Sequence, residues 1–349
     1  MKFKNTNLRS GIAWSIAVLL SASVTTSCQK DAQVTSPTTT TTAVVPSNSM
    51  AIANTTKSLA TTYTSSAPVA INSKSNITIS GLTINCNGGN TVGIQLQGCS
   101  NVHITNCKIY NSTTWGIRLY KCTNVTIDYC YVTNVMTGIY CQLSTLCKVN
   151  NNQLLNMNGP MGSFIQFDNI NGGGNSINYN RCEDVAGVAK HPHDGISLYQ
   201  SNGIKGDSIT VFGNWIRGGQ IAMDGGGACG IGLGDSGGSY QVARGNILVN
   251  PGYVGIQPQG GSVLCSNIKV DHNEIYSSKT AVSLLALGGG GLGSNVYMGY
   301  NYVNWTDSYG RQNFTWQWYS GTPPLATTTN VATTLVNANS LPATIITMN

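Results

Sequence analysis

The sequence predicts an all-β protein built as a solenoid of stacked coils, and three observations support this. Only 9% of the 349 residues are charged, against about 25% in an average globular protein. The chain holds 41 glycines and many Asn, Thr and Ser residues, which favour turns over helices. From about residue 74 the sequence repeats every 22 or 23 residues, and later every 25 to 35. Periods of this size are typical of units that bury their apolar faces against their neighbours.

Residues 1–27 are predicted to be a cleavable export signal. Lys2, Lys4 and Arg9 precede a mainly apolar stretch, Ile12–Val24, which is too short to span a bilayer with margin. Without these three cations the chain has 15 basic and 12 acidic residues. No strongly basic surface is therefore expected, and a nucleic-acid partner is excluded.

The next segment resembles the anchor of a bacterial lipoprotein. Thr25-Thr26-Ser27-Cys28 resembles a lipobox, although Thr25 stands where Leu is usual. Gln29-Lys30-Asp31 is similar to the signal that sends some lipoproteins to the outer face of the outer membrane. The resemblance implies that Cys28 is acylated and that residues 28–48, rich in Thr, Ser and Pro, form a flexible tether. We therefore expect a surface-exposed, exported protein that contacts the membrane through its lipid anchor only.

Three short elements recur in the repeats. The first is an Asn-led strand, as in Asn76-Ile77-Thr78-Ile79, and the second is a Gly-Ile pair, as in Gly116-Ile117-Arg118-Leu119. The third is Asn or Cys two places before an aliphatic residue, as in Cys107-Lys108-Ile109 and Asn214-Trp215-Ile216. We expect the Asn residues to sit at corners, where they tolerate left-handed backbone and can bond to one another along the stack.

These strand-only repeats resemble the right-handed parallel β-helix of the pectate-lyase-like superfamily. The resemblance covers residues 70–305 and implies about ten coils. It predicts one β-helix domain over residues 49–305, a C-terminal cap over 306–349 and a monomer. His103 and His272 lie in the repeated pattern and are interpreted as structural.

The cysteines fit the same repeat. Cys107 and Cys130 share one position on adjacent coils, as do Cys99 and Cys122. Buried Cys packs well as a small apolar residue. The ten cysteines after Cys28 can also form disulfides, whose pairing the sequence does not assign.

Alternation along the Gly-Ile strands predicts two outward-facing rows of residues. One row reads Gln95, Arg118, Tyr140, Gln166, Ser197, Gly232, Gln257, and the other reads Gln97, Tyr120, Gln142, Asp168, Tyr199, Gly234, Gln259. Tyr rings stack on sugars and amides bond hydroxyl groups. The predicted substrate-binding residues are Tyr120, Tyr140, Gln142, Gln166, Asp168 and Gln257. The alternative is an ordinary solvated sheet face.

Two insertions interrupt the repeat, at Gly187–Asp194 and Gln220–Cys229. Loops on a rigid scaffold often carry function. Charged residues also gather here, with 11 in the 64 residues from 181 to 244. We therefore predict the functional site beside these loops.

His191-Pro192-His193-Asp194 resembles the Asp-Pro-His-Asp segment of mannuronan C5-epimerases, with His191 in place of the Asp. Removing the C5 proton of a uronic acid needs a base, a neutraliser for the carboxylate, and an acid. The predicted catalytic residues are His193 as base, Asp194 beside it, Tyr199 as acid, and Arg217 or Arg244 as neutraliser. The same groups would serve a lyase.

Several alternatives remain open. Asp194, Asp224 and Asp235 can instead bind Ca²⁺, which pectate-lyase-like enzymes often use as neutraliser, or act as the acid and base of an inverting glycosidase. His191 and His193 can hold a transition metal. The leading prediction is a cell-surface lyase or C5-epimerase that acts on a uronic-acid-containing polysaccharide. The main alternative is a non-catalytic β-helix that binds glycans or mediates adhesion.

Overall fold

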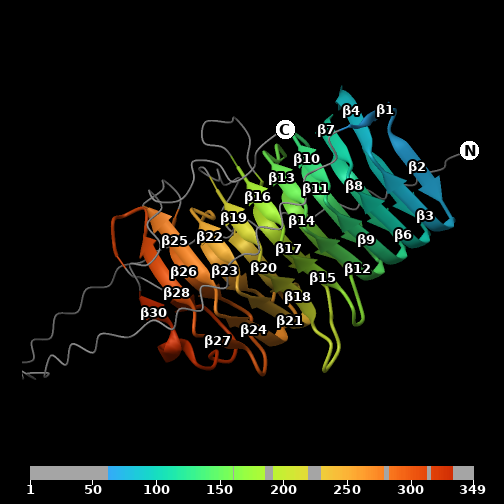
Figure 1. The fold of residues 1–349 in the computed structure, drawn as a ribbon. Coiled ribbons are helices and arrows are strands. Elements are labelled where there is room, and N and C mark those ends of the chain that lie inside the picture. Colours follow the sequence, from blue (N-terminus) through green and yellow to red (C-terminus); the bar gives the residue numbers. More distant parts are fainter. Residues whose placement is uncertain are drawn as a thin grey trace, which may run out of the picture. The chain divides into compact units, whose positions relative to one another are not determined.

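A computed structural model describes residues 62–159, 161–184, 192–218, 229–278, 283–312 and 316–332. They form a stack of turns, and each full turn adds one strand to each of three sheets, here called A, B and C (Figure 1). Each named strand pairs in parallel with its neighbours in the adjacent turns. Sheet C has nine strands, so the described residues make about nine turns. The predicted all-β, right-handed parallel β-helix is confirmed.

The strands follow one another in the order A, B, C along the chain. Sheet A contains β1 (Thr64–Ser66), β4 (Leu82–Gly89), β7 (Lys108–Ser112), β10 (Tyr131–Thr133), β13 (Gln153–Leu155), β16 (Arg181–Glu183), β19 (Trp215–Arg217), β22 (Ile247–Val249), β25 (Glu274–Ser278), β28 (Tyr302–Thr306) and β30 (Val331–Ala332). Sheet B contains β2 (Val69–Asn72), β5 (Ile94–Gln97), β8 (Trp115–Tyr120), β11 (Thr137–Gln142), β14 (Ser163–Asp168), β17 (Asp194–Tyr199), β20 (Cys229–Asp235), β23 (Val254–Pro258), β26 (Leu285–Gly289) and β29 (Trp316–Trp318). Sheet C contains β3 (Ser75–Ser80), β6 (Ser100–Thr105), β9 (Thr123–Asp128), β12 (Thr145–Asn150), β15 (Ser176–Asn178), β18 (Ile209–Phe212), β21 (Ser239–Arg244), β24 (Ser266–Asp271) and β27 (Tyr297–Gly299).

The core lies inside the three sheets and consists of aliphatic columns. On β8, Ile117 and Leu119 are fully buried, whereas Arg118 and Tyr120 between and after them are only half-buried. The same Ile position stacks from turn to turn at Ile94, Ile117, Ile139, Ile165, Ile196, Ile231 and Ile256. Burying one such side chain stabilises the fold by roughly 1.5–3 kcal/mol, so the columns fix the register of every turn.

Close approach explains the glycine that precedes six of these seven Ile residues, the exception being Ile165, which follows Phe164. A Cβ added at Gly116 would lie 2.4 Å from Val132 Cγ1 and 2.7 Å from the Gly138 carbonyl oxygen. A Cβ at Gly138 would meet Leu154 Cδ2 at 2.4 Å. Only glycine leaves room here for the chain to bend from sheet A into sheet B.

A buried ladder of asparagines runs between sheets C and A. Each side-chain amide donates to the amide oxygen of the next Asn at 2.9–3.0 Å, through Asn152, Asn180, Asn214, Asn246, Asn273, Asn301 and Asn330. The predicted stacking of Asn amides is confirmed, but the predicted left-handed backbone at these buried Asn residues is wrong. The residue just before each ladder Asn from Asn152 to Asn301 takes that conformation instead, as Asn151 and His272 do with φ of 59° and 54°.

Cysteines occupy the same ladder position in the earlier turns. Cys130 donates its backbone N–H to Asn152 Oδ1 at 3.0 Å, and Cys107 lies one turn before it. All ten cysteines of the described residues are buried and free. They therefore pack as small core residues, and none of them forms a disulfide.

One register shift separates the expected outer row from the observed one. Tyr199 on β17 pairs with Asp235 on β20, and the shift occurs between Ser197 and Tyr199. The prediction that Gly234 stands in this row was therefore wrong. Gly234 has a φ of 66°, and the local bulge advances the chain by one residue, which brings Asp235 into the outer row.

The predicted cap contributes further strands. β29 continues sheet B beside β26, and β30 continues sheet A beside β28. A short 3₁₀ turn, η1 (Thr327–Thr329), precedes β30. Within the described ranges no helix is long and apolar enough to cross a membrane. The export signal, the tether, Cys28 and residues 333–349 lie outside these ranges.

Candidate functional site

The outer face of sheet B carries the two predicted rows. The first is confirmed residue by residue from Gln95 to Gln257. The second runs from Gln97 through Tyr120, Gln142 and Asp168 to Tyr199, then continues at Asp235. Parallel register thus brings side chains from seven turns onto one surface.

A pocket opens on this face where β17, β20 and β23 lie side by side. Its volume is about 160 Å³, and it is lined by His193, Asp194, Ser197, Cys229, Gly232, Leu233, Asp235, Gln257 and Gln259. Gly232 lies between Ser197 and Gln257 in the register and has no side chain, which leaves the floor of the pocket open. The pocket unites His193, Asp194, Asp235 and Gln257, four of the predicted site residues.

Asp194 is held at the first position of β17. Its Oδ1 accepts a hydrogen bond from the backbone N–H of Cys229 at 3.0 Å and another from the Cys229 thiol at 3.3 Å. Burial is the largest effect on this carboxyl and raises its pKa, although His193 and the Cys229 bonds act in the opposite direction. The thiol contact was not foreseen, because sequence spacing does not show which residue of the next turn faces Asp194.

Asp235 ends β20 and lies in the same pocket. Burial raises the pKa of its carboxyl, and the negative charge of Asp194 raises it further. The charge of Asp194 therefore makes the charged form of Asp235 less favourable, as is typical of acid–base pairs in active sites. Tyr199 is the register partner of Asp235 on the adjacent strand.

His193 lies just before β17. Its backbone N–H donates to the Gly162 carbonyl oxygen at 2.7 Å, which fixes the main chain. Its ring Nδ1 is buried and has no hydrogen-bond partner in the described structure. Gln257 Oε1 is in the same situation. Buried polar atoms without partners cost free energy, so both atoms are suited to meet a ligand.

Neither of the two predicted arginines is among the described residues that line the pocket. Arg217 ends β19 in sheet A, beside Glu183 in the register, at the turn that leads toward β20. Arg244 ends β21 in sheet C, and its guanidinium bonds Asp271 at 2.6 and 2.5 Å. The role of carboxylate neutraliser predicted for Arg244 is therefore wrong, because this residue lies on another sheet and is already paired.

The other predicted sugar-binding residues form a network four to five turns into the stack. Tyr140 donates its hydroxyl to Asp168 Oδ2, and Gln142 Nε2 donates to the same oxygen at 2.9 Å. Arg118 Nη2 donates to Gln142 Oε1 at 3.3 Å. Gln166 lies between this network and the pocket, in register with Tyr140 and Ser197. The sequence analysis missed Trp115, whose ring stacks on Tyr140 with centroids 5.5 Å apart.

The described residues contain no group of three His, Cys, Asp or Glu side chains placed to hold a metal. Asp194 and Asp235 are two of the three predicted calcium ligands, and the third, Asp224, lies outside the described residues, as does His191. Carboxylate and amide oxygens are suitable donors for Ca²⁺. The side chains that the pocket offers to such an ion are those of Asp194, Asp235, Gln257 and Gln259.

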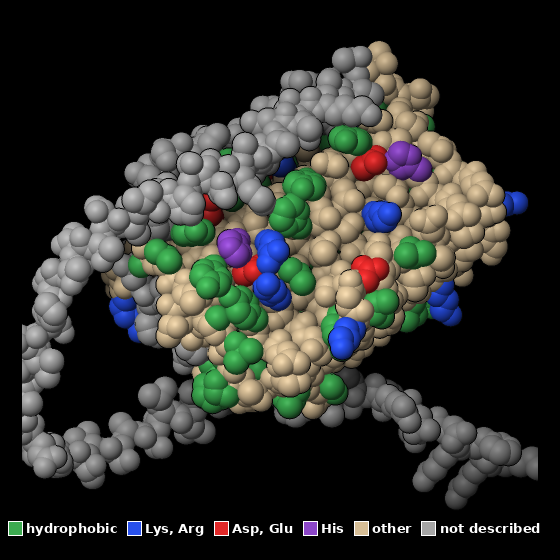
Figure 2. All heavy atoms as spheres, turned by 60° about the horizontal axis from the view of Figure 1, so that its bottom comes forward, with side chains coloured by type: hydrophobic (Ala, Val, Ile, Leu, Met, Phe, Trp, Pro, Cys, Tyr) green, Lys and Arg blue, Asp and Glu red, His purple; other side chains and the backbone are tan. Residues whose placement is uncertain are grey.

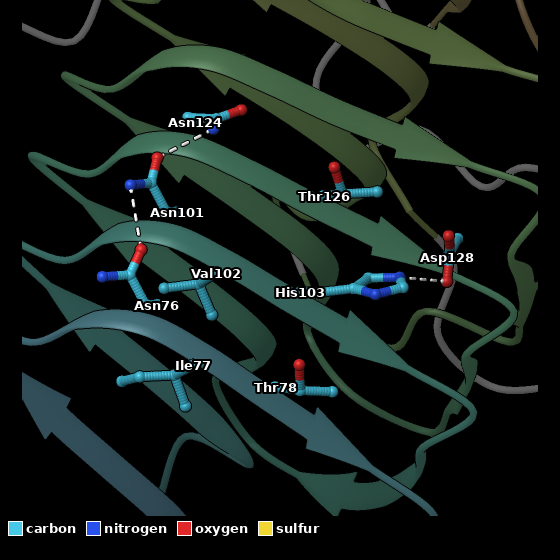
Figure 3. A pocket seen from close by; sticks show the side chains of 9 residues that line it. All are labelled: Asn76, Ile77, Thr78, Asn101, Val102, His103, Asn124, Thr126 and Asp128. Carbon is cyan, nitrogen blue, oxygen red and sulfur yellow. Dashed lines mark hydrogen bonds and ion pairs between the residues drawn. The ribbon is translucent and has the colours of Figure 1, made fainter.

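A larger but shallower groove of about 470 Å³ lies on sheet C (Figure 3). Asn76, Asn101 and Asn124 form a chain of amide hydrogen bonds along one side, and His103 Nε2 lies 2.9 Å from Asp128 Oδ1 on the other. The three Asn residues have left-handed backbone, so this outer ladder is a corner of the solenoid. The contact of His103 with Asp128 agrees with the structural role predicted for His103.

The same side of the molecule carries an ionic cluster at its other end. Asp271 is almost fully buried and accepts bonds from Arg244 and from Lys269 Nζ at 3.2 Å, while His272 Nδ1 lies 3.4 Å away. The face turned forward in Figure 2 shows groups of basic, acidic and His side chains next to hydrophobic ones. Burial raises the pKa of Asp271, but Arg244 and Lys269 together lower it below its usual value. The carboxylate of Asp271 is thus already engaged by two cations, which gives the cluster a structural role.

A comparison with protein families agrees with the fold. A family model described as "Right handed beta helix region" matches residues 30–169, and no curated protein matches the chain. One similar structure is a tailspike protein mutant of E. coli bacteriophage HK620, solved in complex with a pentasaccharide. It is 14% identical with a TM-score of 0.40, and the match covers 72% of this chain and 46% of the tailspike chain. An alginate lyase from Paenibacillus sp. str. FPU-7 is 14% identical with a TM-score of 0.38, over 68% of this chain and 86% of its own.

The catalytic domain of a GH87 α-1,3-glucanase, solved with nigerose, is also 14% identical, with a TM-score of 0.33, over 69% of this chain and 50% of its own. The chain therefore spans about half the length of the tailspike protein and of the glucanase domain. At this level of identity the likeness concerns the fold alone.

Proposed function

We propose that this right-handed parallel β-helix protein processes a polysaccharide on the outer face of sheet B. The observation that carries the proposal is the convergence of His193, Asp194 and Asp235 in one pocket. Two carboxyls with raised pKa values and a histidine with an unpartnered ring nitrogen are a typical set of acid–base groups.

The chemistry we favour is removal of the C5 proton from a uronic acid. His193 is the base, because its buried Nδ1 is free to accept a proton. Tyr199 lies beside Asp235 on the neighbouring strand and serves as the acid for the other face of the sugar or for the leaving oxygen. Return of a proton to C5 gives an epimerase, and loss of the leaving oxygen gives a lyase.

The substrate carboxylate must be neutralised for this step. The described lining of the pocket holds no Lys or Arg side chain. A carboxyl with a raised pKa can stay protonated and donate an O–H hydrogen bond to the substrate carboxylate. We assign this role to Asp194 or Asp235, with the Gln257 and Gln259 amides as further donors.

Calcium remains part of the proposal as an alternative neutraliser. When bound, it would screen the substrate carboxylate, and Asp194, Asp235 and an amide oxygen of Gln257 would hold it. Activity that is abolished by a chelator and restored by Ca²⁺ would support this role. Full activity in the chelator would remove calcium from the mechanism.

Glycoside hydrolysis is the second candidate, and one observation favours it. The charge of Asp194 raises the pKa of Asp235, so one of the two carboxyls can be an acid while the other is a base. Hydrolysis would need neither His193 as base nor Tyr199 as acid. A non-catalytic glycan-binding surface would need no acid–base group at all.

The products decide between these reactions. The purified protein is incubated with acidic and neutral polysaccharides in heavy water, and the products are analysed by mass spectrometry. Unsaturated fragments identify a lyase, saturated fragments a hydrolase, and intact chains that gain deuterium an epimerase. His193→Ala and Asp235→Asn should abolish the signal, whereas His103→Ala on sheet C is the matched control. No change in any polysaccharide contradicts an enzymatic function on that panel.

A further inference from the structure

A cluster of aromatic and cationic side chains lies on the same face as the pocket but apart from it. We call Trp115, Arg118 and Tyr120 of β8 together with Tyr140 of β11 the aromatic platform. The rings of Trp115 and Tyr140 are stacked at an interplanar angle of 13°. The Arg118 guanidinium carbon lies 4.6 Å from the Trp115 ring centroid and 5.6 Å from that of Tyr120. All four side chains are half-buried and thus reach the surface.

Asp168 on the neighbouring strand β14 holds the Tyr140 side of the platform. Its carboxylate accepts the Tyr140 hydroxyl, the Gln142 amide at 2.9 Å and the Asn169 amide at 2.6 Å. These donors engage both carboxylate oxygens of Asp168, and Arg118 is not among its hydrogen-bonding or ion-pair partners. A fixed aromatic surface loses little conformational freedom when a ligand binds.

Arg118 forms no ion pair with an acidic side chain among the described residues. It makes one hydrogen bond, to the neutral amide of Gln142, and its Nε is buried without a partner. No Asp or Glu of the described residues forms an ion pair with it, and none pairs with Lys121, whose ammonium lies 5.2 Å from the Tyr120 ring centroid. A guanidinium fork is suited to bind a planar carboxylate through two parallel hydrogen bonds.

The spacing of the sheet places the platform within reach of a chain bound in the pocket. One strand, β14, lies between β11 and β17, so these two are two steps apart, and four steps lead from β8 to β20. With neighbouring strands about 4.8 Å apart, this amounts to roughly 10–19 Å. A polysaccharide that crosses the strands can therefore touch the platform and the pocket together, whereas a monosaccharide cannot.

We propose that the aromatic platform is a remote subsite for an acidic sugar residue, which packs against the aromatic rings and places its carboxylate on Arg118. The inference rests on the proposed function for the identity of the chain that continues into the pocket. The subsite selects substrates that are both anionic and several residues long. It supplies affinity for the polymer and takes no part in the chemical step.

Direct binding tests this independently of turnover. The full chain carrying Asp194→Asn and Asp235→Asn is titrated calorimetrically with alginate, polygalacturonate and hyaluronate, and with the same polymers after reduction of their carboxylates to alcohols. Trp115→Ala and Arg118→Gln are added one at a time. Tyr179→Ala is the matched control, because Tyr179 is an exposed aromatic residue of the sheet C side that packs edge-on against Phe212.

The two platform variants should behave differently. Trp115→Ala should weaken binding of acidic and reduced polymers alike by about tenfold, since packing does not depend on charge. Arg118→Gln should weaken only the acidic polymers and remove their salt dependence. Tyr179→Ala should change neither. Acidic polymers that fail to bind, or bind equally well to Arg118→Gln and the parent, overturn the subsite.

Failure of the proposed function has a separate signature. It would leave the wild-type protein without products from any polymer, while binding still depends on Trp115 and Arg118. Conversely, turnover with platform-independent binding would keep the enzyme and remove the subsite.

Discussion

At the residue scale, the pocket carboxyls are placed where ionisation is unfavourable. Burial raises the pKa of Asp194 and of Asp235, and the second is raised further by the first. A raised carboxyl pKa means that the folded state binds more protons than the unfolded state between the two pKa values. Stability then falls as the pH rises through that window. The site is thus maintained at the expense of stability, as is common for functional groups.

Asp235→Asn should therefore separate stability from function. The amide carries no charge to desolvate, so the midpoint of urea unfolding at pH 7 should stay the same or increase. Product formation should be lost. A clear decrease in the unfolding midpoint would show that the carboxylate is a structural group and contradict its assignment to the site.

The contribution of Asp271 to stability should depend on pH in the opposite direction. Arg244 and Lys269 lower its pKa despite its burial, so it stabilises the fold above its unfolded-state pKa of about 3.9. That contribution should disappear as the pH falls from about 4 through the lower, folded-state value. Asp271→Asn should reduce stability at pH 7 and flatten its pH dependence below pH 4, as measured by urea unfolding at a series of pH values. An unchanged acid limb would contradict this role.

At the element scale, the turns are joined by two different Asn ladders. The inner ladder is buried. Asn214, for example, accepts hydrogen bonds from the backbone and the side chain of Asn180, and its amide donates to the Ile177 carbonyl and to Asn246. The outer ladder of Asn76, Asn101 and Asn124 is exposed to solvent. An Asn of the inner ladder therefore contributes more to stability than an Asn of the outer ladder, because water can replace only the outer hydrogen bonds.

Asn214→Ala should destabilise the protein by about 1–3 kcal/mol, since it leaves buried donors and an acceptor without partners. The hydrogen bonds lost in Asn101→Ala should cost much less stability. Alanine in the left-handed backbone conformation of residue 101 adds a separate penalty. Asn101→Gly removes that penalty and is the cleaner control. Equal losses for Asn214→Ala and Asn101→Gly in urea unfolding would contradict the distinction.

The Gly-Ile element has a separate steric test. Gly116→Ala would place a Cβ within 2.7 Å of both a buried Val side chain and a carbonyl oxygen of the next turn. Overpacking of this kind costs about 1–3 kcal/mol. Gly261→Ala, whose nearest neighbour would lie 3.5 Å away, should be close to neutral. Thermal unfolding of the two variants measures the difference.

At the scale of the whole molecule, the solenoid turns short sequence repeats into continuous surfaces. Register on sheet B aligns the aromatic platform, Gln166 and the pocket over consecutive turns. Such a surface matches a polymer better than a small molecule, because each turn offers one set of contacts. This geometry, and not any single motif, is the reason for favouring a polysaccharide.

The cellular location is the whole-molecule prediction that the N-terminal sequence makes. If Cys28 is acylated, the protein should sediment with the membrane fraction and be accessible to protease on intact cells. Cys28→Ser should release it from the membranes. A protein that is equally soluble with and without Cys28 would contradict the lipid anchor.

The all-β class, the parallel coils, the buried aliphatic columns and the first outer row could all be predicted from the sequence alone. These follow from local periodicity, since each turn repeats the same pattern against its neighbour. It also indicated the region of His193, Asp194 and Asp235, where the repeat is interrupted and charges gather. It did not reveal that Asp235 replaces Gly234 in the outer row, because a one-residue bulge depends on how β20 packs against β17.

Which charged residues meet depends on the tertiary structure. Arg244 and Asp235 are nine residues apart in the sequence, yet they lie on different sheets, because each turn of the solenoid places successive strands on different sides. The stacking of Trp115 on Tyr140, whose hydroxyl bonds Asp168, likewise joins residues of three different turns. Periodicity predicts which way a side chain points, whereas its partners are set by contacts between residues about one turn apart.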